Sequence, residues 1–235
     1  MSETVIASVP DPLPGADLRL SPETAWQVAH WTIPRPWKAL TRMRVYGADR
    51  LPRDSAYVLA SNHLSWSDPF TVGMLVAPRV LYYMAKRELW SVPVVGTLIP
   101  HTGAFPVDRG QPDRAALRMA RSVLENGQVL GVFVEGTRQK TGEIGNARAG
   151  ASMLAMGAHV PVLPVCVRSG EGFGLPGFPP TSIAVGMPLD LSGLGKGGRA
   201  YKAGAERIEV ELRRLVDFLR ATDRAGRPKR AEPPR

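Results

Sequence analysis

One stretch decides how this chain folds: AYVLASNHLSWSDPF, residues 56–70. Its first six residues form an apolar run typical of a buried strand, and Pro69 favours the start of a helix. His63 and Asp68 then lie five residues apart at a strand-to-helix junction, where they can meet across one turn. Such a pair suits a general base, because the carboxylate holds the imidazole tautomer and stabilises the imidazolium. Asp68 also fits a helix N-cap and His63 an ordinary buried histidine, so the stretch alone leaves both interpretations open.

On either side of this stretch, short β-rich runs alternate with helical segments. We expect strands at 56–61, 79–84, 129–134, 160–168 and 181–187. We expect helices at 69–77, 113–125 and 147–157, and a terminal helix with an apolar stripe of Ile208, Leu212, Leu215 and Leu219. This alternation predicts an α/β fold with a mainly parallel central sheet flanked by helices. The predicted organisation is an irregular lead at 1–20, N-terminal interfacial helices at 21–44, one main domain at 45–222, and a basic disordered tail at 223–235.

The composition is that of a basic globular protein. Its 235 residues are 44% hydrophobic and 22% charged, which excludes general disorder. The net charge of +9 favours an anionic partner, such as nucleic acid, an acidic membrane surface, or a phosphorylated or acidic carrier substrate. The single cysteine, Cys166, excludes an internal disulfide and a cysteine-based zinc cluster. Its apolar neighbours predict a buried residue.

Membrane contact is predicted to be peripheral. No secretory signal is visible, and no run reaches the ~18–20 apolar residues that a membrane-spanning helix needs. The longest uncharged apolar stretch, 89–100, contains two prolines and fits either a core loop or a segment that dips into lipid. The N-terminal helices place tryptophans beside basic residues, which is typical of helices lying on anionic lipid, although packing of the aromatic face on the domain is the alternative. We therefore expect a protein on the cytoplasmic face of the membrane.

Four sequence blocks resemble those of the glycerolipid acyltransferase family. They are NHLSWSD at 62–68, GAFPVDR at 103–109, FVEGTR at 133–138 and VPVLPV at 160–165. The blocks have the family's order and spacing, and the resemblance covers about residues 38–190. The chain departs from the pattern at Val134, where the family usually has proline, and near Arg148, where an aromatic residue is lost. These departures bear on the identity of the acceptor more than on the reaction.

The resemblance implies acyl transfer from a thioester to the free hydroxyl of lysophosphatidic acid, which gives phosphatidic acid. His63 is implied as the base and Asp68 as its orienting partner, with no metal or other cofactor and with acyl-CoA or acyl-carrier protein as co-substrate. Arg138 follows a predicted strand, at the edge where open α/β sheets place ligands, and guanidinium groups suit phosphate oxygens. The residues implied in binding substrate are Arg138, Arg109, Glu135, Gly136, Thr137, Phe105 and Asn62.

The sequence leaves other functions open. The resemblance favours lysophosphatidic acid, the family's central substrate, and the alternative acceptors are glycerol 3-phosphate, another lysophospholipid and an amine-linked lipid. Outside this class, the chain fits a non-catalytic basic scaffold that binds membrane, or a nucleic-acid binder. No aromatic-basic readout motif, zinc pattern or recognition helix favours nucleic acid, so we expect no nucleic-acid partner. The intact set of His63, Asp68, Glu135 and Arg138 favours an enzyme over a scaffold.

Overall fold

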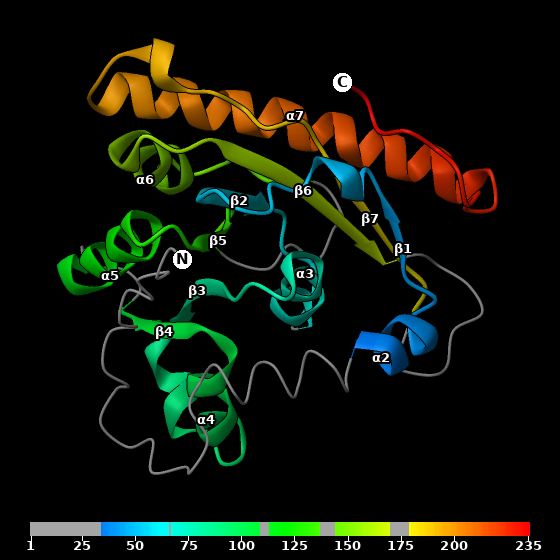
Figure 1. Cartoon of the computed structure of the whole chain (residues 1–235), viewed down its shortest axis with the longest axis horizontal. Coiled ribbons are helices and arrows are strands. Elements are labelled where there is room, and N and C mark those ends of the chain that lie inside the picture. The colour runs from blue at the N-terminus through cyan, green and yellow to red at the C-terminus, as the bar shows by residue number, and fades with distance from the viewer. Residues whose placement is uncertain (1–33, 66, 109–112, 137–143, 170–178) are drawn as a thin grey trace, which may run out of the picture.

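The computed structural model describes residues 34–65, 67–108, 113–136, 144–169 and 179–235, and in these residues helices cover both faces of a central sheet (Figure 1). The strands are β1 (Arg44–Tyr46), β2 (Tyr57–Ser61), β3 (Leu81–Lys86), β4 (Ala104–Val107), β5 (Val129–Phe133), β6 (Val162–Ser169) and β7 (Thr181–Val185). The α-helices are α2 (Pro34–Leu40), α3 (Asp68–Val76), α4 (Val95–Leu98), α5 (Arg114–Glu125), α6 (Gly150–Ala158) and α7 (Gly198–Arg224). Short 3-10 helices are η1 (Ala48–Arg50), η2 (Arg87–Ser91), η3 (Ile99–Thr102) and η4 (Ser192–Leu194).

The strands of the described sheet run in the order β1-β7-β6-β2-β5-β3-β4. All neighbouring pairs are parallel except β6 with β7. The predicted α/β fold with a mainly parallel sheet flanked by helices is therefore confirmed. Every predicted strand and helix of the main domain is present within a few residues, whereas β1 and β4 were not predicted as strands because each is only three or four residues long.

Two apolar cores lie on opposite faces of the sheet. Along β2, Val58 and Ala60 belong to the core beneath α5, α6 and α7, whereas Tyr57 and Leu59 belong to the core beneath α3. Burial on both faces explains why β2 is apolar without alternation, as parallel strands usually are. The predicted stripe on the terminal helix is confirmed, since α7 buries Ile208, Leu212, Leu215 and Leu219 completely.

The N-terminal helix differs from its predicted position. The sequence predicts interfacial helices that continue to residue 44, but α2 begins at Pro34 and ends at Leu40, and β1 already begins at Arg44. Prolines fit the first turn because its backbone N–H groups have no helical acceptor. The Trp37 ring packs edge-on against Phe70 of α3, with centroids 4.9 Å apart. Trp37 therefore packs on the domain, which is the alternative to a position on lipid for this tryptophan. The predicted lead at 1–20 and the residues up to 33 lie outside the described residues.

The C-terminal tail lies against the domain, unlike the disordered tail that the sequence predicts. After α7 the chain turns back along the β1 side, and its end lies beside α7 (Figure 1). The Arg50 guanidinium donates hydrogen bonds to the carbonyls of Pro233 at 2.7 Å, Pro234 at 2.9 Å and Val185 at 3.2 Å. A proline-rich segment has carbonyls but few N–H groups, so a guanidinium with five donors is well suited to hold it. Among the described helices, none is both long and apolar enough to cross a membrane.

We expect Arg50→Ala to release this tail. The change removes the two hydrogen bonds from Arg50 to the tail, each worth about 1 kcal/mol. Trypsin should therefore cut faster after Lys229 and Arg230, as followed by mass spectrometry of the intact chain. Arg53→Ala, a change at an exposed arginine three residues away, is the control and should leave the cleavage rate unchanged. Equal rates in both variants would show that Arg50 does not hold the tail.

Candidate active site

The candidate site lies where the chain leaves two adjacent parallel strands in opposite directions. After β2 the chain passes to α3 on one face, and after β5 it passes towards α6 on the other. Open α/β sheets bind ligands at such a switch point, beyond the carboxyl ends of the strands, and we call this edge of the sheet the crevice. The register pairs Ser61 with Phe133, so His63 and Glu135, each two residues further on, lie opposite one another.

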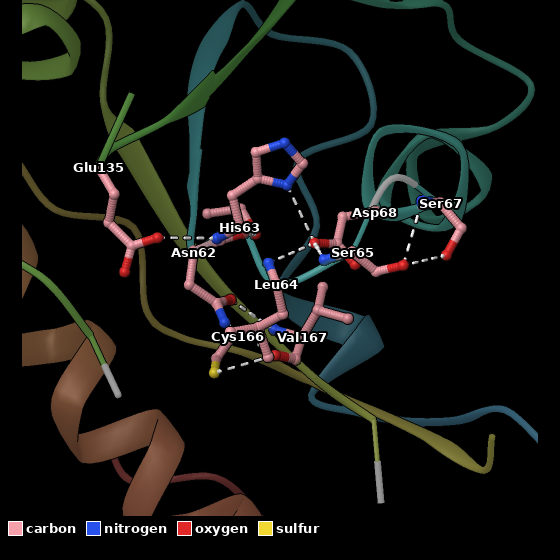
Figure 2. Close-up of polar contacts among 10 residues, drawn as sticks. Asn62, His63, Leu64, Ser65, Ser67, Asp68, Glu135, Cys166 and Val167 are labelled. Carbon is pink, nitrogen blue, oxygen red and sulfur yellow. Dashed lines mark hydrogen bonds and ion pairs between the residues drawn. The ribbon is translucent and has the colours of Figure 1, made fainter. Parts of the chain in front are cut away.

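His63 and Asp68 make the contact that their spacing predicts. The His63 Nδ1 atom lies 3.0 Å from Asp68 Oδ2 (Figure 2). Because a carboxylate only accepts hydrogen bonds, this contact assigns the ring proton to Nδ1 and leaves Nε2 as the basic nitrogen. None of the described residues hydrogen-bonds Nε2, and the side chain is 13% exposed. The His63 ring is therefore oriented, and its second nitrogen is available to accept a proton.

Asp68 is not the N-cap that the sequence allowed. The cap position is Ser67, and Asp68 is the first residue of α3, with its side chain turned back towards the preceding loop. Its Oδ2 atom accepts hydrogen bonds from the backbone N–H groups of Leu64 and Ser65, both at 2.6 Å. With His63, three donors converge on one buried oxygen. This arrangement fixes the loop and the imidazole together.

Glu135 holds the same turn from the opposite side (Figure 2). Its Oε2 atom accepts the backbone N–H of His63 at 3.1 Å, and its Oε1 atom accepts that of Gly145 at 2.8 Å. The residue is buried, and burial raises the pKa of its carboxyl group, while the two N–H donors act against that shift. Glu135 thus connects the segment that carries the base to the segment that follows residue 143.

Asn62 joins the same loop to β6. Its amide Nδ2 donates to the Val167 carbonyl, and its Oδ1 accepts from the Val167 N–H, both at 2.8 Å. Both polar atoms of this buried side chain are therefore used by the backbone. The Asn62 side chain thus contacts backbone in this structure, whereas the family resemblance implies a contact with substrate.

Phe133, which the sequence did not indicate as a site residue, lies against the His63 ring. Phe133, the last residue of β5, stacks on the His63 ring with centroids 4.3 Å apart and planes 27° apart. The stacked face limits rotation of the imidazole and shields it from water. The signal in the sequence is that Phe133 opens the block FVEGTR, two residues before Glu135.

The other predicted binding residues fall in three places. Phe105 is buried in the main core on β4, two strands beyond β5, and so does not line the crevice. Gly136 has φ +71°, and a Cβ there would lie 3.2 Å from Nε of the exposed Arg148. The Arg148 N–H donates to the Val134 carbonyl at 2.8 Å, which holds this cation near the end of β5. Arg109, Thr137 and Arg138 lie outside the described residues.

Two features of the described residues concern reactive or metal-binding groups. Cys166 is fully buried, as predicted, and burial raises the pKa of its thiol. Across residues 34–235, apart from the gaps stated above, no three His, Cys, Asp or Glu side chains are grouped so as to hold a metal ion.

The part of the chain that carries this site matches a known protein family. A family model described as Acyltransferase matches residues 42–168, more than half of the chain, including both His63 and Glu135. The chain belongs to the acyltransferase family. All four sequence blocks lie within the matched residues, so the family resemblance that they indicate is confirmed.

Relatives of this acyltransferase-family chain share one name. The 1-acyl-sn-glycerol-3-phosphate acyltransferase of Bacillus subtilis is 34% identical over 126 residues, which are 54% of this chain and 62% of that protein. The protein of the same name from Streptococcus pneumoniae is 28% identical over 183 residues, 76% of this chain and 68% of that protein. This chain therefore matches about three fifths of the length of the Bacillus relative.

A solved structure supports the same relationship. The crystal structure of the 1-acyl-sn-glycerophosphate (LPA) acyltransferase from Thermotoga maritima superimposes with a TM-score of 0.66 at 25% sequence identity. The match covers 85% of this chain and 81% of that one. This chain therefore shares its fold with a solved acyltransferase structure.

We expect Glu135→Gln to change how stability depends on pH. Burial raises the pKa of Glu135, so the folded chain holds its proton at a pH where the unfolded chain has released it. As the pH rises above the ordinary glutamate pKa of about 4.3, the free energy of unfolding of the wild type should therefore fall relative to that of Glu135→Gln, by about 1.4 kcal/mol per unit of pKa difference. Urea unfolding across this range measures the slope.

The exposed Glu125 provides the matched control, because Glu125→Gln should leave the slope unchanged. A wild type that gains stability over Glu135→Gln as pH rises would mean that the two N–H donors outweigh burial.

Proposed function

We propose that this chain transfers a fatty acyl group from an acyl thioester to the free hydroxyl of lysophosphatidic acid, forming phosphatidic acid for phospholipid synthesis. The observation that carries the proposal is the oriented His63–Asp68 pair, 3.0 Å apart, in the crevice of an acyltransferase-family fold. The names of the relatives support this acceptor. Glycerol 3-phosphate, another lysophospholipid and an amine-linked lipid are the alternatives that an acceptor panel separates.

In the proposed reaction, the substrate's hydroxyl is the nucleophile. His63 Nε2 takes the hydroxyl proton as the oxygen attacks the carbonyl carbon of the thioester, and the carbon–sulfur bond then breaks. The imidazolium returns its proton to the leaving thiolate, so His63 ends the cycle neutral. Asp68 keeps the proton on Nδ1 before attack and stabilises the imidazolium afterwards. Acyl-CoA and acyl-carrier protein both present the required thioester.

Binding of the acceptor phosphate is proposed for Arg138 and Arg109, which follow β5 and β4 in the sequence. Arg138 follows Gly136 by two residues, and Arg109 follows β4 by two residues. The exposed Arg148, held beside Gly136, adds a described cation at the same end of β5. Guanidinium groups bind phosphate oxygens in a bidentate way, which would align the acceptor hydroxyl with His63.

The proposed location is peripheral, on the cytoplasmic face of an anionic membrane. Lysophosphatidic acid and its product are lipids, so the crevice must meet a membrane surface. The net charge of +9 attracts the chain to such a surface. On α2, Lys38 and Leu40 are exposed while Trp37 packs on the domain, which suits a helix whose outer face meets headgroups.

We expect His63→Ala and Asp68→Asn each to lose at least about a hundredfold in acyl transfer, the lower bound for a positioned base. The exposed His159, at the end of α6, supplies the control, since His159→Asn should keep full turnover. Product formation from thioester and lysophosphatidic acid is followed by mass, with circular dichroism to confirm the fold. Near-normal turnover by folded His63→Ala protein would end the proposed mechanism.

We expect Arg138→Ala to weaken the use of a phosphorylated acceptor by about ten- to a hundredfold in kcat/KM, as for a lost charge-assisted hydrogen bond. Turnover of monoacylglycerol, which lacks the phosphate, should stay the same. Arg207→Ala, at an exposed position on α7, is the matched control. Equal losses with both acceptors would exclude a phosphate clamp at Arg138.

A further inference from the structure

An exposed aliphatic surface lies between β3 and β4, on η2 and α4. This segment projects from the β4 side of the sheet, away from α7 (Figure 1). Among the described residues, seven large hydrophobic side chains are exposed, and four of them lie here. We call these four the apolar tip: Leu89 (37% exposed), Val92 (42%), Val94 (69%) and Val95 (39%).

The centre of the apolar tip is a strained turn. The Val95 N–H donates to the Pro93 carbonyl at 2.8 Å, and Val94 between them has φ +67° and ψ −52°. These angles and this hydrogen bond define a γ-turn of the rare positive-φ type, which is unfavourable for a β-branched residue. Because Val94 is largely exposed, packing within the described chain does not offset the strain. Strain of this kind concentrates at functional positions.

The apolar tip is held in one shape by the residues around it. The Gly96 N–H donates to the Val92 carbonyl at 2.8 Å, and Thr97 Oγ1 donates to the Val94 carbonyl at 2.7 Å. A Cβ at Gly96 would lie 2.2 Å from the Trp90 carbonyl oxygen, so this approach requires glycine. Beneath the tip, Trp90 packs in a small cluster with Ala85, Ile99 and Ala104. The aliphatic side chains are therefore presented outward by a braced support.

The charge pattern identifies the kind of surface that the apolar tip fits. No Asp, Glu, Lys or Arg occurs from residue 89 to residue 107, whereas charged residues border the segment on both sides. The bordering Lys86 and Arg87 are paired with Glu88 and Asp108, at 2.9 and 2.6 Å. An acidic protein partner would need available cations on this surface, but hydrocarbon needs only aliphatic area. The net charge of +9 supplies long-range attraction to anionic headgroups.

The apolar tip also lies near the edge of the sheet that carries the crevice. The segment starts at the carboxyl end of β3, and β3 is parallel to β5, which is parallel to β2. A membrane that holds the tip would thus meet the same edge from which His63 projects. We propose that the apolar tip inserts into the acyl region of an anionic bilayer and fixes this edge of the sheet at the lipid surface. The inference rests on the proposed function only for the lipid nature of the acceptor.

Two matched double variants of the full chain test the proposal. Val92→Ser/Val94→Gly removes two aliphatic side chains from the tip, and Met187→Ser/Val210→Ser removes two comparably exposed side chains elsewhere. Binding is measured by co-sedimentation with vesicles of phosphatidylglycerol and phosphatidylcholine, at low salt and at high salt. We expect the tip variant to lose about tenfold in vesicle partition at both salt levels, because it loses buried apolar area. The control should change by less than about twofold, since scattered surface hydrophobics are ordinary.

Further measurements separate the loss of lipid insertion from a loss of folding or of catalysis. Val94→Gly should melt no lower than the wild type, because glycine adopts positive φ without strain, and a lower melting temperature would contradict the strained turn. Turnover of vesicle-embedded lysophosphatidic acid should fall with binding, while turnover of a monodisperse short-chain acceptor should not. Equal vesicle binding in both double variants, or equal loss of turnover on the monodisperse acceptor, would overturn the proposal. A wild type without turnover on either acceptor would refute the proposed function, and vesicle partition would still decide the role of the tip.

Discussion

The parallel pairing of β2 with β5 on one side and β6 on the other determines where each group of the crevice lies. Ser61 is opposite both Phe133 and Val165 in the two ladders. One residue later Asn62 reaches Val167, and two residues later His63 meets Glu135. A slip of one residue in either pairing would turn these side chains to the other face of the sheet. The two apolar cores prevent that slip, because each strand buries alternate residues on both faces.

Two buried carboxylates hold the histidine turn by different means. Asp68 contacts the imidazole and two neighbouring backbone N–H groups, whereas Glu135 contacts the backbone N–H of His63 and leaves the ring alone. Charges of the same sign would repel across so short a turn, and the N–H dipoles around each carboxylate offset that repulsion. The turn is therefore stabilised as one polar unit, in which the ring is oriented by one carboxylate and the backbone by the other.

The sequence predicts much of this arrangement. The spacing of His63 and Asp68 predicts their contact, and the apolar runs predict the central strands and the buried stripe of α7. Other features depend on tertiary contacts that no local pattern records. The Asp68 side chain turns back to Leu64 and Ser65 rather than capping α3, and Phe105 joins the core rather than the crevice. The tail looks disordered by composition, but its ordering depends on Arg50, far away in the chain.

The side chain of Asn62 serves as one more rung of the β2–β6 ladder. The regular rungs of that ladder are made by backbone atoms, which every amino acid supplies, so substitutions leave them in place. This rung is made by a side chain instead. In Asn62→Asp an oxygen would replace the donating nitrogen, so two acceptors would face each other at the Val167 carbonyl. The position of His63 relative to β6 therefore depends on the identity of one side chain, Asn62. A substitution at Asn62 can therefore shift the His63 turn without rebuilding a strand.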